Sequence, residues 1–571
     1  MERQPLVGGS GAPRSAWRQL PTWTLLGGVC AAGIGGTFQY GYNISLLSGP
    51  TQHIHQFLND TWQSRYQTKL SPSMLTLLWS TIASIFSLGG FFGAHLGGIM
   101  AGCLGRKGAL LMNNLLALFA AALMGASFPT GLFELLIAGR FLIGMNTGIG
   151  LSVQPLYIGE TAPRHLRGAF MMGNSIFLTG GILTGQLMGL RELLGGEARW
   201  PFLVASCGLP AILQLLSLPW FPESPRFTLL DQGDEAKAVQ ALKRFHGPLH
   251  YHKELEDIQR ESLALGGEKA KKPWELFADR SIRWQLIAVI CLTMGQQLSG
   301  INAIYFYASY VFAETGIPHE KIPYVTLGTG VCECLTALTC GLLVESLGRR
   351  ALILGGYGLM MLWCVILTIS LTFQVYAWAP YLSMACIFAF ILSFGLGPGG
   401  VTNILTTELF TQSSRPAAYT IAGSMSWLSF FAVGMLFPFV VTFDKEADGQ
   451  VFMTREFVLP DVPPPPHWDD LGQHCRRASR PQPKGGLGHF CFLVFLLECS
   501  AVAAFIFWAI PETKNKTFLE IKREFHKLNF RGAKEPAAAS PGGPRAGSEL
   551  GNPGATPRGP PVPGSRPRSC S

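Results

Sequence analysis

The sequence predicts an all-α membrane protein, with twelve transmembrane helices in two pseudo-symmetric six-helix bundles. Three observations lead to this fold class. Hydrophobic residues make up 48% of the chain and charged residues only 14%, whereas charged residues are about 25% of a soluble domain. About twelve apolar runs are each long enough to cross roughly 30 Å of hydrocarbon. A set of charged motifs occurs twice in the same order, which indicates two homologous halves.

The apolar runs give the predicted helices in order. In the first half they lie at residues 22–44, 74–99, 109–127, 132–157, 168–190 and 199–220. In the second half they lie at residues 283–312, 323–346, 351–374, 380–407, 416–441 and 489–510. In lipid only a helix satisfies its backbone within one segment, and no run alternates as a barrel strand does. The predicted domains are an N-terminal segment (1–21), two bundles (22–220 and 283–510), a linker with short helices (221–282) and a tail (511–571).

Three kinds of charged motif occur once in each half. The pairs are Gly105-Arg106-Lys107 with Gly348-Arg349-Arg350, Glu160 and the following arginines with Glu408 and Arg415, and Pro222-Glu223-Ser224-Pro225-Arg226 with Pro511-Glu512-Thr513-Lys514. The offset between copies is 248 for the second pair and 289 for the third, so the second half holds an insert. We place it at 442–488 and expect a disordered loop, because four consecutive prolines interrupt it and it lacks an apolar period. The alternative is a segment introduced by a gene-model error.

The distribution of basic residues predicts the orientation. With a cytoplasmic N-terminus, the basic residues of the duplicated motifs and of the linker all fall on the cytoplasmic side, as the positive-inside rule requires. Asn59-Asp60-Thr61 is then a glycosylation acceptor in the first outer loop. Both termini are cytoplasmic, and the tail after about residue 530 is expected to be disordered. The net charge of +9 follows from this topology and does not indicate nucleic-acid binding.

The duplicated charges also predict a gate on the cytoplasmic side. Its residues are Arg106, Glu160, Arg164, Arg167, Arg349, Arg350, Glu408 and Arg415. Charges at helix ends are tolerated where they face water or each other, and acids and bases are duplicated together. We therefore expect Glu160 to face Arg415 across the two halves, and Glu408 to face Arg164 or Arg167, with Arg106 and Arg349 bracing the pairs. The alternative is that the arginines only set the topology.

Several motifs resemble one known family. They are Gly139-Arg140, Pro222-Glu223-Ser224-Pro225-Arg226, Gln296-Gln297-Leu298-Ser299-Gly300-Ile301-Asn302 and Pro511-Glu512-Thr513-Lys514. The chain resembles the sugar porters of the major facilitator superfamily and, more narrowly, the animal facilitative hexose transporters. The stretches 38–43 and 386–410 are similar to the second, fructose-associated class of those transporters. The resemblance covers roughly residues 20–530 apart from the insert, and it implies transport by alternating access.

The predicted sugar site combines amides and aromatic residues. Each hydroxyl of a neutral sugar both donates and accepts, and side-chain amides can match both roles. Gln296, Gln297 and Asn302 supply amides on helix 7, where Gly295 and Gly300 would let the helix unwind; amides spaced this closely could instead tie helices together. By resemblance, Trp427 packs on the sugar, and Tyr305, Phe306 and Tyr307 close an outer gate. The remaining predicted site residues are Tyr40, Gln186, Glu333 and Asn403.

Three positions depart from the pattern of the glucose carriers. Ser175 stands where the family has a glutamine on helix 5, and Asn403 where glucose-type members have a tryptophan. Glu333 stands midway along an apolar helix in place of an asparagine. A buried carboxyl is protonated or paired. Glu333 is therefore expected to bind sugar, to bind another polar solute, to confer proton dependence, or to act as a structural acid.

No energy source is visible in the sequence. There is no Gly-Lys pair and hence no ATP-binding loop, and Asn43 stands where proton-coupled sugar porters carry an aspartate. The predicted function is facilitative transport of fructose or glucose, without a cofactor, metal or enzymatic activity, by a monomer in a lipid bilayer. The alternatives are a carrier of another polar solute such as an organic anion, sugar transport influenced by protons through Glu333, and a non-transporting sensor. The plasma membrane is the expected location, an endosomal or lysosomal membrane is the alternative, and Glu2, Leu6 and Val7 form a candidate signal for sorting adaptors.

Overall fold

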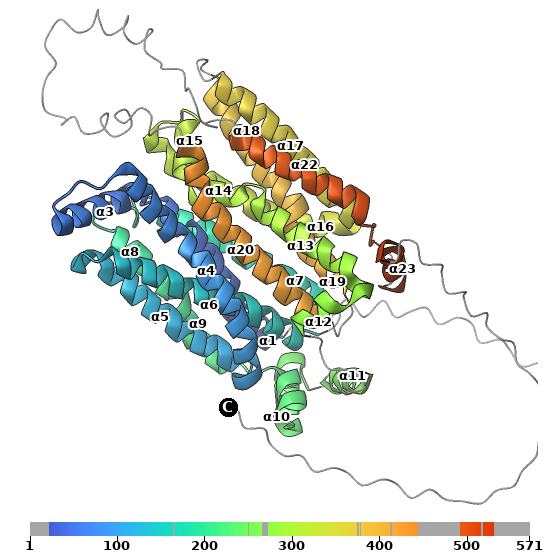
Figure 1. Ribbon diagram of the computed structural model, residues 1–571. Helices are drawn as coiled ribbons and strands as arrows, with labels where there is room; N and C mark the ends of the chain where they lie inside the picture. Colours follow the sequence, from blue (N-terminus) through green and yellow to red (C-terminus); the bar gives the residue numbers. More distant parts are fainter. Residues whose placement is uncertain are drawn as a thin grey trace, which may run out of the picture.

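The computed structural model describes residues 22–163, 166–248, 251–264, 272–373, 376, 378–410, 414–442, 491–514 and 518–529. Within these residues the chain forms helices and no strand. The helices pack into two bundles, one formed by the N-terminal half and one by the C-terminal half (Figure 1). The predicted all-α fold with two bundles is confirmed.

The N-terminal bundle follows the six predicted apolar runs. Its helices are α1 (Trp23–Gly33) continuing into α2 (Gln39–Ser45), α4 (Pro72–Leu104), α5 (Arg106–Thr130), α6 (Phe133–Thr161), α7 (Arg167–Met188) and α8 (Trp200–Ala205) followed by α9 (Gly208–Ser217). One further helix, α3 (Thr51–Tyr66), lies at one end of the bundle (Figure 1). It was not among the predicted spans because it is short and polar. The predicted glycosylation residue Asn59 lies on α3.

The C-terminal bundle repeats this order. Its helices are α13 (Arg283–Leu298) with α14 (Ile301–Phe306) and α15 (Ala308–Glu314), α16 (Ile322–Leu347), α17 (Arg349–Thr372), α18 (Ala379–Phe394) with α19 (Gly400–Leu409), α20 (Arg415–Thr442) and α22 (Cys491–Ala509). By length and composition, nine helical stretches of the described residues can cross a membrane. The segments α1–α2, α7 and α16 complete the predicted twelve.

Four short helices lie at the end of the bundles opposite α3. In the sequence, the first bundle is connected to the second by α10 (Glu235–His246), α11 (Tyr251–Ala264) and α12 (Pro273–Ala278). The last long helix, α22, is followed by α23 (Phe518–Asn529) (Figure 1). They are amphipathic or polar, so they cover the bundle ends and do not cross the bilayer. We call the two ends of the molecule the α3 end and the α10 end.

Four of the long segments are interrupted, and in the sixth the break separates α8 from α9. The first helix passes through a π-helical turn at Ile34–Phe38, and the tenth through a similar turn at Gly395–Gly399 that contains Pro398. Between α13 and α14 the chain turns at Gly300, which has φ +98°, a conformation that costs a side-chain-bearing residue free energy. These interruptions place irregular backbone in the interior of the bundles, where a ligand can reach it.

The two bundles meet along α4 with α20 and along α7 with α16. Figure 1 shows α4 and α20 side by side. At the α3 end, Ser309 Oγ donates to the carbonyl oxygen of Ser48 (2.8 Å), and Tyr324 donates to Glu192 (2.7 Å). The halves are therefore joined by hydrogen bonds at the α3 end.

Several predictions fall on residues that the structure does not describe. These are Arg164 of the predicted gate, most of the predicted insert, the candidate sorting signal at Glu2, Leu6 and Val7, and the tail after Asn529.

Candidate functional site

The amides predicted on the seventh membrane segment, which consists of α13 and α14, form one hydrogen-bonded group. Asn302 Nδ2 donates both to Gln297 Oε1 (2.6 Å) and to the carbonyl oxygen of Gln297 (3.0 Å). The positive φ of Gly300 breaks the helix between them, and it brings Asn302 back over a carbonyl group that the helix no longer uses. Gln297 Nε2 in turn donates to Ser426 Oγ on α20 (2.8 Å). Gln296 is half-buried beside this group.

A second amide joins the two halves, in the last turn of α7. Gln186 on α7 is buried, and its Nε2 donates to Thr329 Oγ1 on α16 at 3.0 Å. Its other polar atom, Oε1, is buried and has no hydrogen-bond partner among the described residues. Glu333 lies one helical turn beyond Thr329, on the same face of α16. Gln186 therefore offers a free acceptor at the boundary between the halves.

Aromatic residues connect these two amide groups. Tyr40 on α2 lies with its ring centroid 5.6 Å from that of Trp427 on α20, in an edge-to-face arrangement. Tyr40 is also close enough to Glu333 to interact electrostatically. Trp427 is buried, 6% exposed, and its ring lies against Gly90 of α4, where a Cβ would be only 2.5 Å away. Both halves thus contribute to one row of polar and aromatic side chains.

Glu333 is the one acid in this row. It is only 8% exposed, and it sits midway along α16, far from either helix end. A carboxyl group at this depth in a membrane is expensive unless it is neutral or paired. Its position beside Tyr40 and near Gln186 places it at the predicted site rather than on the outer surface of the bundle.

Two predicted positions do not join the row. Asn403 on α19 is exposed, and its backbone carbonyl accepts hydrogen bonds from Thr407 and Tyr419. Ser175 on α7 is also exposed. No described contact links either side chain to Gln297 or to Trp427.

The aromatic residues predicted as an outer gate are buried between α14 and α20. Phe306 stacks on Phe430, with ring centroids 4.8 Å apart and planes at 4°. Tyr307 donates its hydroxyl to the carbonyl oxygen of Gly434, whereas the buried hydroxyl of Tyr305 has no partner among the described residues. These residues lie between the amides and the α3 end, where Ser309 reaches Ser48.

A cavity of about 150 Å³ lies at the α3 end above these aromatic residues. Thr51, His55, Thr76 and Trp79 of the N-terminal half line it, and Phe306 and Tyr307 of the C-terminal half form its floor. The cavity is therefore separated from the amide row by the predicted gate.

In the conformation described, the charged motifs pair within each half, and the predicted cross-half pairs stay a prediction for the opposite state. Arg106 binds Glu160 at 2.9 Å, and Arg349 binds Glu408 at 3.1 Å. In this conformation Glu160 therefore faces Arg106 and not Arg415, and Glu408 faces Arg349 and not Arg167.

Two further arginines of the predicted gate, Arg415 and Arg167, also have other partners. Arg415 donates to the carbonyl oxygen of Phe410 (3.3 Å), and Arg167 lies 3.8 Å from Glu254 on α11. The sequence did not predict these partners. A helix end contacts adjacent helices of its own bundle, and the repeat does not show which of those helices supplies the partner.

The third motif caps a helix in each half. The Glu223 carboxylate accepts the backbone N–H groups of Lys107 and Gly108, the first residues of α5. In the second half, Glu512 accepts the N–H groups of Arg349 and Arg350 at 3.0 Å each, at the start of α17. A carboxylate at a helix N-terminus satisfies donors that have no partner within the helix.

This capping changes the acidity of Glu512. Burial alone would raise the pKa of its carboxyl group, but hydrogen bonds from the backbone N–H groups of Lys514, Arg349, Arg350 and Thr513 lower that pKa below its usual value. The ionised form is therefore the one that holds α17 to the segment after α22.

The two halves differ at one point of the charged motifs. Ser224 donates its hydroxyl to Glu160 Oε2 in the first half. In the second half the equivalent atoms, Glu408 Oε2 and Thr513 Oγ1, are both buried without a partner among the described residues. Arg415 Nε is likewise buried without one. In the second half, the charged motifs at the α10 end thus contain acceptor and donor atoms that have no hydrogen-bond partner among the described residues.

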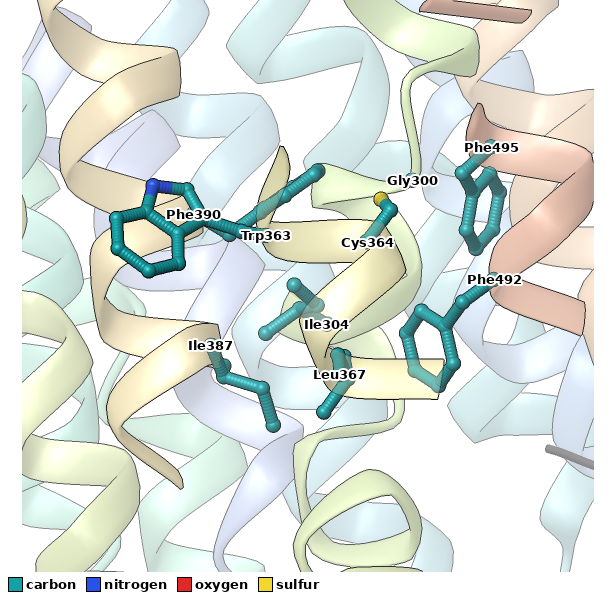
Figure 2. A pocket seen from close by; sticks show the side chains of 9 residues that line it. All are labelled: Gly300, Ile304, Trp363, Cys364, Leu367, Ile387, Phe390, Phe492 and Phe495. Carbon is teal, nitrogen blue, oxygen red and sulfur yellow. The ribbon is translucent and has the colours of Figure 1, made fainter. Parts of the chain in front are cut away.

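A small apolar pocket of about 10 Å³ lies behind the break in the seventh helix. Figure 2 shows Gly300 and Ile304 on one side of it, and Phe492 and Phe495 of α22 on the other. Its other walls are apolar side chains of α17 and α18. The pocket offers no polar group to a sugar, but it leaves space next to a helix break.

Two six-helix bundles that share one buried row of amides and aromatic rings define a membrane carrier for small solutes. Residues 29–525 match the family described as "Sugar (and other) transporter". Human facilitated glucose transporter member 11 is 45% identical, covering 88% of this chain and 93% of the relative. Human member 9 is 42% identical (91% and 88%), and human member 5 is 40% identical (87% and 91%).

The chain belongs to the family described as "Sugar (and other) transporter" and, within it, to solute carrier family 2. It is a multi-pass membrane protein and not an enzyme. Among solved structures it is similar to the xylose transporter XylE from E. coli in a partially occluded inward-open conformation, with TM-score 0.67 and 20% identity, covering 87% and 100% of the two chains. At that identity the likeness supports the fold alone.

Proposed function

We propose that the protein is a facilitative hexose carrier that works by alternating access. The observation that carries this proposal is the row formed by Gln297, Asn302, Trp427, Tyr40 and Gln186, to which both halves contribute. The amides supply paired donors and acceptors for adjacent hydroxyl groups, and the indole ring offers an apolar face for the C–H edge of a sugar. The names of the related human proteins, which are facilitated glucose transporters, support the same class of substrate.

The absence of an acid at Asn43 favours movement down the sugar gradient. Asn43 is fully buried, and its Nδ2 donates to the carbonyl oxygen of Gln39 at 2.9 Å. An amide cannot release and take up a proton during the cycle. The sugar gradient alone therefore drives net flux.

The protonation state of Glu333 bears on which class of solute the carrier accepts. A buried acid in the substrate row either carries a proton and donates to a hydroxyl group, or is ionised and repels an anion. The ionised form disfavours an organic anion such as urate, whereas the protonated form can donate to a sugar hydroxyl group or to the oxygen of an anion. Protonated Glu333 also gives a second candidate function, in which hexose transport depends on pH.

The charged motifs act as a gate at the α10 end. In the conformation described, Glu160 and Glu408 are held by arginines of their own halves, and Glu408 Oε2 and Arg415 Nε keep free positions. When the halves rock so that the α3 end opens, the α10 end closes. Cross-half contacts from Glu160 to Arg415 and from Glu408 to Arg167 then become available. The aromatic residues Tyr305, Phe306 and Tyr307 separate at the same time.

The α10 end faces the cytoplasm in this proposal, because the duplicated arginines and the linker helices lie there. Asn59 on α3 then faces outward and carries the glycan. The protein acts as a monomer in the plasma membrane, with an endosomal location as the alternative. Sorting adaptors that bind Glu2, Leu6 and Val7 would decide between the two membranes.

The test is uptake of labelled fructose and glucose into proteoliposomes, with and without a pH gradient. We expect both sugars to equilibrate without a gradient, and Gln297→Ala to abolish uptake. Gln63→Ala, which removes an exposed amide of α3, is the matched control and should transport normally. Flux that requires a pH gradient and is lost in Glu333→Gln would establish the second candidate function and overturn uniport.

A further inference from the structure

A second buried acid, Glu498, lies outside the substrate row. It is on α22, in the middle of the apolar stretch Phe492–Ala509. Both oxygens of its carboxyl group are buried, and among the described residues neither has a strong hydrogen-bond donor; the thiol of the adjacent Cys499 is a weak one. The substrate row and the charged motifs make no use of this residue.

Glu498 faces α13 at Gly295, directly before Gln296 and Gln297. A Cβ at Gly295 would lie 3.2 Å from Glu498 Oε1 and 2.6 Å from a methyl group of Val502. Gly295 is therefore needed for α22 to approach this closely. It immediately precedes Gln296 and Gln297, so the acid lies directly behind the residues that we assign to the sugar.

The same helix also contacts the other end of the amide segment. Phe495 lies one turn before Glu498 on α22, and its ring is 2.7 Å from the Cβ position of Gly300. Phe495 lines the small apolar pocket of Figure 2, beside Gly300. α22 thus supports the seventh helix at Gly295 with an acid and at Gly300 with an aromatic ring.

Another polar group lies near Glu498. Tyr357 on α17 is fully buried, and its hydroxyl group has no partner among the described residues. Tyr357 and Glu498 are close enough to interact electrostatically, and the thiol of Cys499 is close enough to form a weak hydrogen bond with Glu498. In the conformation described, the tyrosine hydroxyl therefore has no partner among the described residues, and the acid has at most the weak thiol donor.

An unsatisfied polar group in the membrane interior destabilises the conformation that contains it. A conformation in which the protonated acid donates to the tyrosine hydroxyl does not carry that cost. Because Glu498 packs on Gly295, a shift of the seventh helix changes the position of the acid. The two groups therefore respond to the movement that alternating access requires.

We propose that Glu498 is a positioning residue for the seventh helix, which forms a hydrogen bond with Tyr357 only in the conformation open at the α3 end. This hydrogen bond stabilises the open conformation and so lowers the population of the conformation that is closed at the α3 end. This inference rests on the proposed alternating-access function.

The test measures how accessible the α3 end is. A cysteine introduced as Thr76→Cys, in the cavity at that end, is labelled by a membrane-impermeant maleimide, in a background whose other cysteines do not react. Glu498→Leu removes the unsatisfied group, so labelling should slow by roughly fivefold or more. Hexose turnover should fall in parallel. Glu498→Gln keeps the hydrogen-bonding group and should restore both rates.

A second variant keeps the proposal falsifiable if Glu498→Leu fails to fold. Tyr357→Phe removes only the proposed partner, so it should slow labelling by itself, and adding Glu498→Leu should have little further effect. Equal labelling of wild type, Glu498→Leu and Tyr357→Phe would overturn the proposal. If the wild type labels as expected but transports no hexose, the proposed substrate fails while the positioning role stands.

Discussion

Gln297 is the central hydrogen-bonding residue of the row of amides and aromatic rings that we assign to the sugar. It receives two hydrogen bonds from Asn302 and donates one to Ser426 on α20. A sugar that enters the row competes with these internal bonds and can replace them one for one. An amide that is already oriented loses less conformational freedom on binding.

Asn302→Ala should weaken sugar binding. The substitution removes the side chain that fixes Gln297, and it leaves a buried carbonyl oxygen with one partner fewer. A loss of about 1–2 kcal/mol corresponds to a KM that rises roughly 5- to 30-fold, which uptake at graded hexose concentrations measures. Asn403→Ala is the matched control: its side chain is exposed and joins no described contact in the row, so its KM should stay within about twofold. Equal effects of both substitutions would contradict this assignment.

Among residues, the sequence singled out those with unusual chemistry. The amides of the seventh helix and Glu333 were visible because polar side chains are rare in apolar runs. Thr329 and Ser426 were missed, because hydroxyl groups are common in membrane helices and usually bond to their own backbone. Like Glu333, Glu498 is an acid within an apolar run, but only its contact with Gly295 in the structure indicated a role for it.

At the scale of elements, two features decide how helices are held: the break at Gly300 and the capped start of α17. The break exists because Gly300 adopts a positive φ in which a side chain is strained. The cap exists because Glu512 lies beside the N-terminal N–H groups of Arg349 and Arg350.

Gly300→Ala should impair the carrier. The added methyl group would meet the ring of Phe495 at 2.7 Å, and the residue would keep a left-handed backbone. We expect a loss of roughly 1–3 kcal/mol of stability and a lower turnover number. Gly98→Ala is the control, since a Cβ at that helical glycine meets nothing within 4 Å. Thermal unfolding in detergent measures both variants, and an unchanged midpoint for Gly300→Ala would show that the break is not strained.

Glu512 makes the stability of the second bundle depend on pH. Its pKa is lowered in the folded protein, so its contribution is present above the ordinary carboxyl pKa and is lost as the pH falls through the lowered folded value. Glu512→Gln should therefore reduce the stability at pH 7 by about 1–2 kcal/mol, allowing for solvent screening. In strong acid the variant and the wild type should converge.

Unfolding midpoints of the two proteins across the acid range measure this difference. Glu197→Gln, which changes an exposed acid at the α3 end, should show no such pH dependence. A gap between Glu512→Gln and wild type that stays constant down to strong acid would rule out ionisation as the cause.

At the scale of the whole molecule, hydrogen bonds join the halves at the α3 end, and Ser424 on α20 also lies 3.3 Å from His95 on α4, nearer the α10 end. Hydrogen bonds join Ser309 to Ser48 and Tyr324 to Glu192 across the halves. At the α10 end the described pairs Arg106–Glu160 and Arg349–Glu408 lie within single halves. Such an arrangement suits one of the two states that a rocking carrier needs.

Arg415→Ala should favour the conformation described here. The arginine lacks an ion pair in this state among the described residues, and we assign its partner, Glu160, to the opposite state. Its loss removes about 1 kcal/mol or more from that opposite state, so a Thr76→Cys reporter should be labelled several-fold more slowly. Arg191→Ala, at an exposed position of the α3 end, should leave the labelling unchanged. Faster labelling of Arg415→Ala would reverse the assignment of states.

The sequence by itself determined the membrane class, the two homologous halves and the family, and it supplied the residues of the sugar site that we propose. It did so because hydrophobic length and repeated motifs are properties of the chain alone. Only the tertiary structure decided that Glu160 and Glu408 pair with Arg106 and Arg349, that Gln186 bonds Thr329, and that Glu498 lies behind Gly295. Those contacts depend on how two bundles pack in one conformation, and a linear repeat does not record which side chains that packing brings together.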